Sequence, residues 1–148
     1  MKVLFAHAAL IAGLGLAAQS FAADAPAKGG EMLMATMNGA NEKPTAGDPK
    51  ASGMAHVTID ASKNQVCYEL MVKDLAQPIM AHIHKGGPTE AGPPALALTP
   101  PDANGHSQGC VNADAALIKS LEQDPAAYYV NVHSATYKAG AIRGQLAK

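Results

Sequence analysis

Apolar and polar residues alternate along most of the chain after about residue 31, in short runs separated by segments rich in Gly, Pro, Asn and Asp. Such alternation is typical of β-strands that bury one face. The runs predict strands at 31–37, 53–60, 65–75, 80–84, 95–98, 127–134 and 141–147, and they predict loops at 86–94 and 100–109. Helical spacing is confined to 115–122, where Leu117, Ile118 and Leu121 form an apolar stripe after a capping residue at Asn112 or Asp114.

The number and spacing of these runs predict one all-β domain, a Greek-key β-sandwich of seven to nine strands with one short helix. A parallel α/β architecture would need helices between the strands, and one helix is too few. A chain of 148 residues is long enough for such a domain to bury a core without help from a metal.

Two of the predicted strands carry histidines on the same face. In MAHIH at 80–84, His82 and His84 point to one side of an extended strand and the residues between them to the other. In YVNVH at 129–133, the valines face the core, so His133 lies on the opposite side. If the strands are adjacent, we expect one mononuclear metal site on the outer face of the sheet, with ring nitrogens within roughly 3 to 4 Å of one another. The alternative is a hydrogen-bonded cluster of polar side chains.

Four other residues are candidates for a supporting role or an additional ligand: His56, Met80, Asn131 and Arg143. Arg143 cannot be a ligand itself, because a guanidinium has no lone pair to give. Imidazole ligands suit Cu(II) and Zn(II), and methionine thioethers suit Cu(I). The methionines at positions 32, 34, 54 and 80 therefore favour copper over zinc, unless they simply fill the core.

The beginning of the chain resembles a secretory signal peptide. Lys2 precedes an apolar run, and Ser-Phe-Ala at 20–22 provides the small residues of a cleavage site. The run is shorter than the ~20 residues that a membrane span needs. We predict a signal peptide at 1–22, a flexible arm of small residues at 23–31 and one domain at 32–147. The mature protein is expected in the periplasm or outside the cell, with no membrane span.

The two cysteines are interpreted in the light of that export. Cys67 and Cys110 are the only pair in the chain, and an oxidising compartment favours a disulfide between them. Thiolate ligation of a metal is the alternative, but there is no C-x-x-C motif. The near-neutral formal charge of -1, without a basic run, indicates that nucleic acid is not a partner.

Four motifs, in order, resemble the CHRD domain, a family named after chordin and found in exported bacterial proteins. They are NGANEKP at 38–44, AHIH at 81–84, YVNVH at 129–133 and GAIRGQL at 140–146. The resemblance implies an immunoglobulin-like β-barrel distantly similar to copper/zinc superoxide dismutase, but no settled activity. By that analogy, His82, His84 and His133 correspond to copper ligands. A bridging histidine has no clear counterpart, because His106 lies in a differently spaced loop.

Three functions remain open from the sequence. The chain could store, deliver or detoxify copper through the three histidines, or it could be a dismutase-like redox enzyme in which Arg143 attracts an anion. It could also be a metal-free module that binds another exported protein.

Overall fold

The computed structural model describes residues 30–148. The predicted signal peptide at 1–22 and most of the predicted arm at 23–31 therefore lie outside the described residues. Glu31 is an exception, because it pairs with Ile59 as the first residue of a strand and so is not part of an arm. In chain order the elements are β1 (Glu31–Asn38), η1 (Gly39–Asn41), β2 (Ser52–Asp60), β3 (Gln65–Lys73), β4 (Pro78–Lys85), β5 (Pro94–Leu98), β6 (His106–Asn112), α1 (Ala115–Gln123), η2 (Pro125–Ala127), β7 (Tyr128–Ser134) and β8 (Ile142–Gln145).

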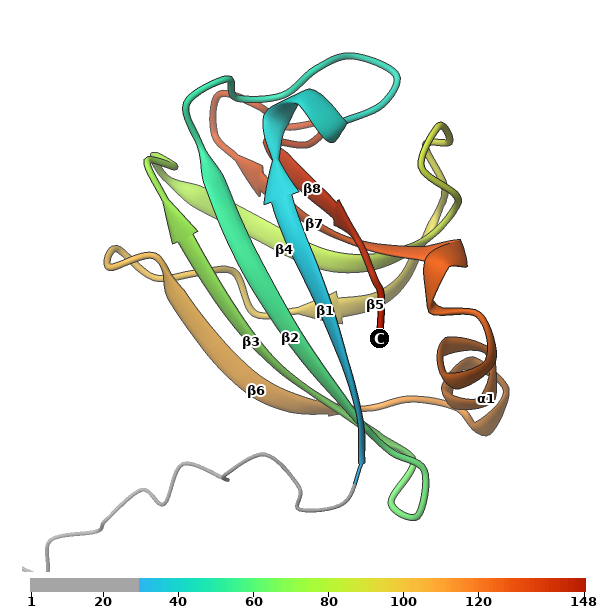
Figure 1. The fold of residues 1–148 in the computed structure, drawn as a ribbon. Helices are drawn as coiled ribbons and strands as arrows, with labels where there is room; N and C mark the ends of the chain where they lie inside the picture. Colours follow the sequence, from blue (N-terminus) through green and yellow to red (C-terminus); the bar gives the residue numbers. More distant parts are fainter. Residues whose placement is uncertain (1–29) are drawn as a thin grey trace, which may run out of the picture.

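All eight strands belong to one antiparallel sheet with the order β5-β4-β7-β8-β1-β2-β3-β6. The prediction of an all-β domain with one short helix is confirmed. The sheet curls into a nearly closed barrel (Figure 1). The strands β8 and β1 share the fewest residue pairs in the sheet. They pair at Asn38 and Arg143, and Met34 of β1 forms an isolated bridge with Ala147. This junction divides the sheet into two halves that enclose one core, β5-β4-β7-β8 and β1-β2-β3-β6.

Strand alternation accounts for the core as the sequence predicts. In β2 the buried apolar side chains are those of Ala55, Val57 and Ile59, and in β4 those of Ala81 and Ile83. The helix α1 begins after Asp114, whose side chain accepts a hydrogen bond from the Leu117 amide as an N-cap. Its apolar stripe adds Ile118 and Leu121 to the same core. No helix among residues 30–148 is long and apolar enough to cross a membrane.

The prediction of a loop at 100–109 is wrong for its last residues, because His106 to Asn112 form the strand β6. This strand pairs with β3 alone and lies at the edge of the sheet. Its sequence, HSQGCVN, lacks the apolar alternation of the other strands, because an edge strand that buries little needs few apolar side chains. The backbone pairing with β3 therefore determines its conformation.

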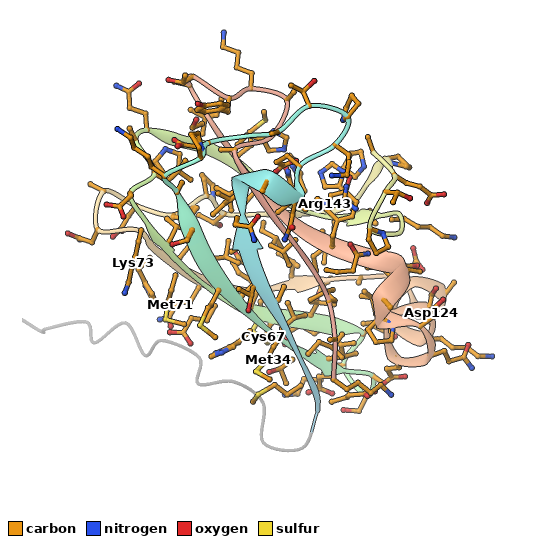
Figure 2. The ribbon with its side chains drawn as sticks, turned by 45° about the horizontal axis from the view of Figure 1, so that its top comes forward. Met34, Cys67, Met71, Lys73, Asp124 and Arg143 are labelled. Atoms are coloured by element: carbon orange, nitrogen blue, oxygen red, sulfur yellow. A yellow bond between two sulfur atoms is a disulfide. The ribbon has the colours of Figure 1, made fainter. Side chains whose placement is uncertain are left out.

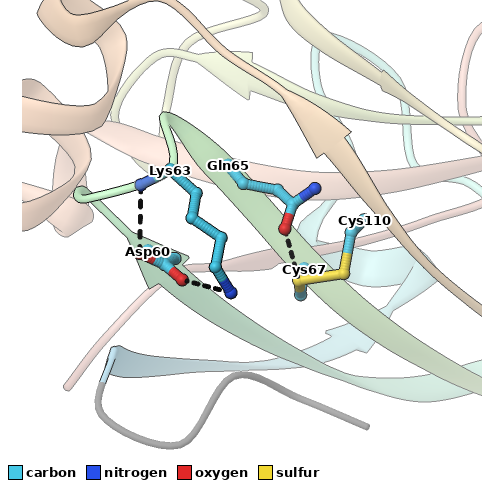
Figure 3. The surroundings of a disulfide bond; sticks show 5 residues. All are labelled: Asp60, Lys63, Gln65, Cys67 and Cys110. Carbon is cyan, nitrogen blue, oxygen red and sulfur yellow. Dashed lines mark hydrogen bonds and ion pairs between the residues drawn. A yellow bond between two sulfur atoms is a disulfide. The ribbon is translucent and has the colours of Figure 1, made fainter. Parts of the chain in front are cut away.

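The predicted disulfide is confirmed. Cys67 of β3 and Cys110 of β6 are directly opposite in the register, their Cα atoms are 3.9 Å apart and their sulfurs are bonded (Figure 3). It links the edge strand β6 covalently to its neighbour. Among the described residues there is no free cysteine, so thiolate ligation of a metal has no candidate there.

Candidate metal centre

The structure brings His82, His84 and His133 together. β4 and β7 pair antiparallel, with His82 opposite Asn131 and Met80 opposite His133, so the three rings lie on one face. The His82 ring centroid is 5.3 Å from that of His84 and 5.2 Å from that of His133. One ring nitrogen from each residue lies within 4.8 Å of the other two, a wider spacing than the sequence-based expectation. We call these residues the three-histidine cluster.

Hydrogen bonds to backbone carbonyls determine which ring nitrogen carries the proton in two of the three histidines. The Nδ1 atom of His84 lies 2.8 Å from the Gly92 carbonyl oxygen, and that of His133 lies 2.9 Å from the Lys138 carbonyl oxygen. A carbonyl can only accept, so each Nδ1 donates and each Nε2 is unprotonated and carries a lone pair. This outer hydrogen bond is the arrangement that orients metal-binding histidines in proteins.

The third histidine completes the cluster. The Nδ1 atom of His82 lies 3.2 Å from the Nε2 atom of His133. Because that Nε2 atom is an acceptor, the Nδ1 atom of His82 donates the hydrogen bond in the metal-free protein. A metal would require that proton to move to the other nitrogen of His82. The Nε2 atom of His84 is buried and has no hydrogen-bond partner. An unpaired buried acceptor costs about 1–3 kcal/mol, which a bound cation would relieve.

The face that carries the cluster is less exposed than the sequence indicated. It lies outside the core, as predicted, but loops cover it, and every residue of β7 is buried. His133 is 7% exposed, whereas His82 and His84 are half-buried. We therefore call β5-β4-β7-β8 the covered half of the sheet. Burial lowers the pKa of His82 and of His84 below the usual value, which favours the neutral form that a metal ligand needs.

Arg143 holds the principal covering loop in place. Its two terminal nitrogens donate to the carbonyl oxygens of Glu90 and Gly87, each at 2.6 Å. Its guanidinium carbon lies 3.4 Å from the centre of the Tyr129 ring, which in turn stacks on the ring of His84 at 4.9 Å. The Gly/Pro loop (residues 86–93) is thus fixed above the face. Because this loop supplies the Gly92 carbonyl, Arg143 supports the orientation of His84 indirectly.

A second buried contact joins the motifs at 38–44 and 129–133. The Asn131 side-chain nitrogen donates to a carboxylate oxygen of Glu42, which is 4% exposed. Burial raises the pKa of Glu42 to about 7, although the charge of Arg143 and the hydrogen bond from Asn131 oppose this. The distant motifs therefore meet in one network on the covered half. The Asn131 Oδ1 atom is buried without a partner.

The remaining candidates are divided between the two halves. Met80 lies on the same face as the cluster, opposite His133, and is 42% exposed. Arg143 and Asn131 contribute through the covering loops. His56 lies elsewhere, on β2 in the half β1-β2-β3-β6, with its Nδ1 atom 3.7 Å from the Glu69 carboxylate, so it does not join the cluster.

Sequence analysis missed Tyr129, Glu42 and Gly92 as contributors to this site. The roles of Glu42 and Gly92 depend on loops that fold back over the sheet, and strand alternation contains no information about such loops. Tyr129 lies opposite His84 on the same face, so alternation gives its position but not its stacking contact. One indirect signal was present: Glu42 lies in the segment 38–44, one of the four motifs that resemble the CHRD domain.

The comparisons with known proteins agree with this architecture. The model of the CHRD domain matches residues 33–146, which run from within β1 to the residue after β8 and include all three histidines. A search of curated proteins finds no match. The matched region covers most of the chain and nearly all of the described residues, and we conclude that the chain belongs to the CHRD domain family.

Proposed function

We propose that this domain binds a transition metal, most favourably copper, through the three-histidine cluster, and that it stores, delivers or detoxifies copper as an exported protein. The observation that supports this most is that one ring nitrogen from each of the three histidines lies within 4.8 Å of the other two, while hydrogen bonds to backbone carbonyls leave Nε2 of His84 and His133 unprotonated. Zinc fits the same donor set, and copper is favoured because methionine Met80 lies beside it.

The distances are compatible with a single ion. A metal with bonds of about 2.0 Å and tetrahedral angles holds its ligand nitrogens about 3.3 Å apart. The nitrogens of His82 and His133 are already 3.2 Å apart, and the 4.8 Å limit for the whole set requires only a small movement of one ring. Three neutral ligands leave a fourth position for water or for the Met80 sulfur.

The enzyme alternative is less well supported than the binding function. That alternative requires Arg143 to attract an anion, but this side chain is 1% exposed and donates hydrogen bonds to two loop carbonyls. The likeness to the superoxide dismutase barrel implied by the family remains a proposal about the fold. If the cluster binds no ion, a metal-free module that binds another protein becomes the better explanation.

Titration of the purified domain with Cu(II), followed by electron paramagnetic resonance, tests the proposal. We expect one equivalent to bind with nitrogen hyperfine structure, and His84→Ala to lower the affinity more than 100-fold. Because His84 stacks on Tyr129, the fold of the variant is checked by circular dichroism, and His82→Ala, which lacks that stacking contact, is measured as a second variant.

His106→Ala is the matched control, because it removes an imidazole from the half β1-β2-β3-β6. Its Cu(II) affinity should stay within threefold of the wild-type value. If folded His84→Ala and His82→Ala both bind Cu(II) as the wild type does, the cluster is not the site, and the interaction module becomes the better explanation.

A further inference from the structure

The outer face of β1-β2-β3-β6, which we call the open half of the sheet, exposes an unusual set of side chains. Among the described residues, the exposed large apolar side chains are four methionines and one isoleucine, and three of those methionines lie on β1 and β2. Met32 is 56% exposed, Met34 46% and Met54 43%. A solvent-facing sheet surface normally carries polar residues. Thioethers are the shared chemistry of this surface.

The register places sulfur and imidazole ligands in adjacent positions. Met54 of β2 is opposite Met71 of β3, and Met71 is opposite His106 of β6, so the three form one row across three strands. The neighbouring row contains Met34 opposite His56. Figure 2 labels Met34, Cys67 and Met71 in this half, far from Arg143 in the covered half. Side chains opposite one another have Cβ atoms about 4.5–5.5 Å apart, so flexible methionines can reach a common ion.

The Glu69 carboxylate orients the imidazole of this row. Its Oε1 atom lies 3.1 Å from Nε2 of His106, and because a carboxylate only accepts, Nε2 donates and Nδ1 keeps its lone pair. The other oxygen of Glu69 lies 3.7 Å from His56. A carboxylate behind a histidine is a frequent partner of metal ligands, which it orients and makes more basic. The open half thus has its own oriented imidazole.

We propose that Met54, Met71 and His106 form a second metal site, which binds Cu(I). All three donors are neutral and the two thioethers are soft, so the set suits a monovalent soft ion better than Zn(II) or Cu(II). Met34 and His56 lie in the next row and can replace one of the three ligands. This site shares no residue with the three-histidine cluster and does not depend on the function proposed for it.

Competition with a chromogenic Cu(I) chelator under anaerobic conditions tests the site. The measurement is made in the His84→Ala protein, so that the three-histidine cluster does not contribute. We expect this protein to retain one equivalent of Cu(I), and the added pair Met54→Leu and Met71→Leu to lower the Cu(I) affinity at least tenfold. Leucine keeps the size and apolar character of methionine, so the fold should be unaffected.

Met32→Leu is the matched control, because Met32 is on the same face but two rows away, opposite Thr58. Its Cu(I) affinity should be unchanged. Nuclear magnetic resonance of methionine methyl groups with Ag(I), a redox-inert substitute for Cu(I), should shift Met54 and Met71 and leave Met32 in place. Equal Cu(I) affinity with and without the Met54 and Met71 sulfurs, or unshifted methyl groups, would overturn the site and indicate an apolar contact surface instead.

Discussion

The two halves of the sheet both carry histidines, but they hold them in opposite ways. In the covered half, His84 and His133 donate to backbone carbonyls, and His84 stacks on the buried Tyr129. In the open half, His106 is oriented by Glu69, whose side chain is 42% exposed, among methionines that face solvent. Buried contacts fix the imidazoles of one half before any ligand arrives, whereas the side chains of the other half face solvent.

This difference would let the two proposed sites select different kinds of ion. A preorganised set of imidazoles imposes a geometry and loses little conformational freedom on binding. Flexible thioethers impose little geometry, and their selectivity comes from the softness of sulfur. The loops over β7 therefore matter to the proposed site in the covered half as much as its ligands do. Three predictions use this contrast.

The largest effect is expected from removal of the disulfide in the open half. Cys67 and Cys110 are separated by 43 positions, and in the chain-entropy model such a cross-link stabilises the fold by up to about 4 kcal/mol. Replacing both by serine should lower the free energy of unfolding by that order, measured by urea denaturation. Because β6 carries His106, Cu(I) affinity should fall while Cu(II) affinity changes little. Equal losses at both sites would contradict the independence of the halves.

A pH-dependent effect of up to about 3 kcal/mol on the free energy of unfolding is expected from Glu42, which contacts Asn131 of the covered half. Its pKa rises from 4.5 to about 7 on folding, so the folded state holds the proton more tightly than the unfolded state. The contribution to stability is greatest below pH 4.5, falls as the pH rises to about 7 and is then constant. Glu42→Gln should remove this slope, making the variant the more stable protein at pH 8.

Urea denaturation at pH 5, 6, 7 and 8 measures the difference between Glu42→Gln and the wild type. The lowered pKa values of His82 and His84 give a slope of the opposite sign below pH 6.5, but both proteins share it, so it cancels. Glu122→Gln, on helix α1 outside the covered half, is the control. A constant difference at all four pH values would show that Glu42 ionises normally.

A smaller effect, about 10- to 100-fold in metal affinity, is expected from Arg143→Lys. Lysine keeps the positive charge, but its single ammonium cannot span the carbonyls of Glu90 and Gly87 or stack on Tyr129 as a planar guanidinium does. The loop and its Gly92 carbonyl should then orient His84 less well. Calorimetric titration with Zn(II) measures the change, with exposed Lys73→Arg in the open half as the control. A Zn(II) affinity within twofold of wild type would show that the loop does not influence the cluster.

Much of the fold followed from the sequence because strand alternation is a local property. The inward residues of β2, β3 and β7, the hairpin between β7 and β8 and the limits of α1 could all be predicted in this way. The same alternation placed His82, His84 and His133 on one face, since β4 and β7 are neighbours. The disulfide followed from the cysteine count and the predicted export.

What could not be predicted depends on contacts between distant segments. Strand β6 is held by its pairing with β3 and has no apolar pattern of its own. The role of Arg143 requires the carbonyl positions of the Gly/Pro loop, and that of Glu42 requires a loop to place its carboxylate beside Asn131. Alternation predicts that His56 lies on the outer face of its strand, and it does, but that strand belongs to the open half and not to the half with the cluster. Alternation determines which face a side chain occupies, but not which strand lies next to it.

The pairing of β4 with β7 also has a consequence for folding. His82 and His133 are 51 positions apart, and contacts between such distant residues form late, because the entropy of closing the intervening chain must first be overcome. Until β7 has docked beside β4, the chain presents the two imidazoles of β4 without the third. The complete cluster therefore reports that β4 and β7 have paired, and chains that stop before β7 lack it altogether.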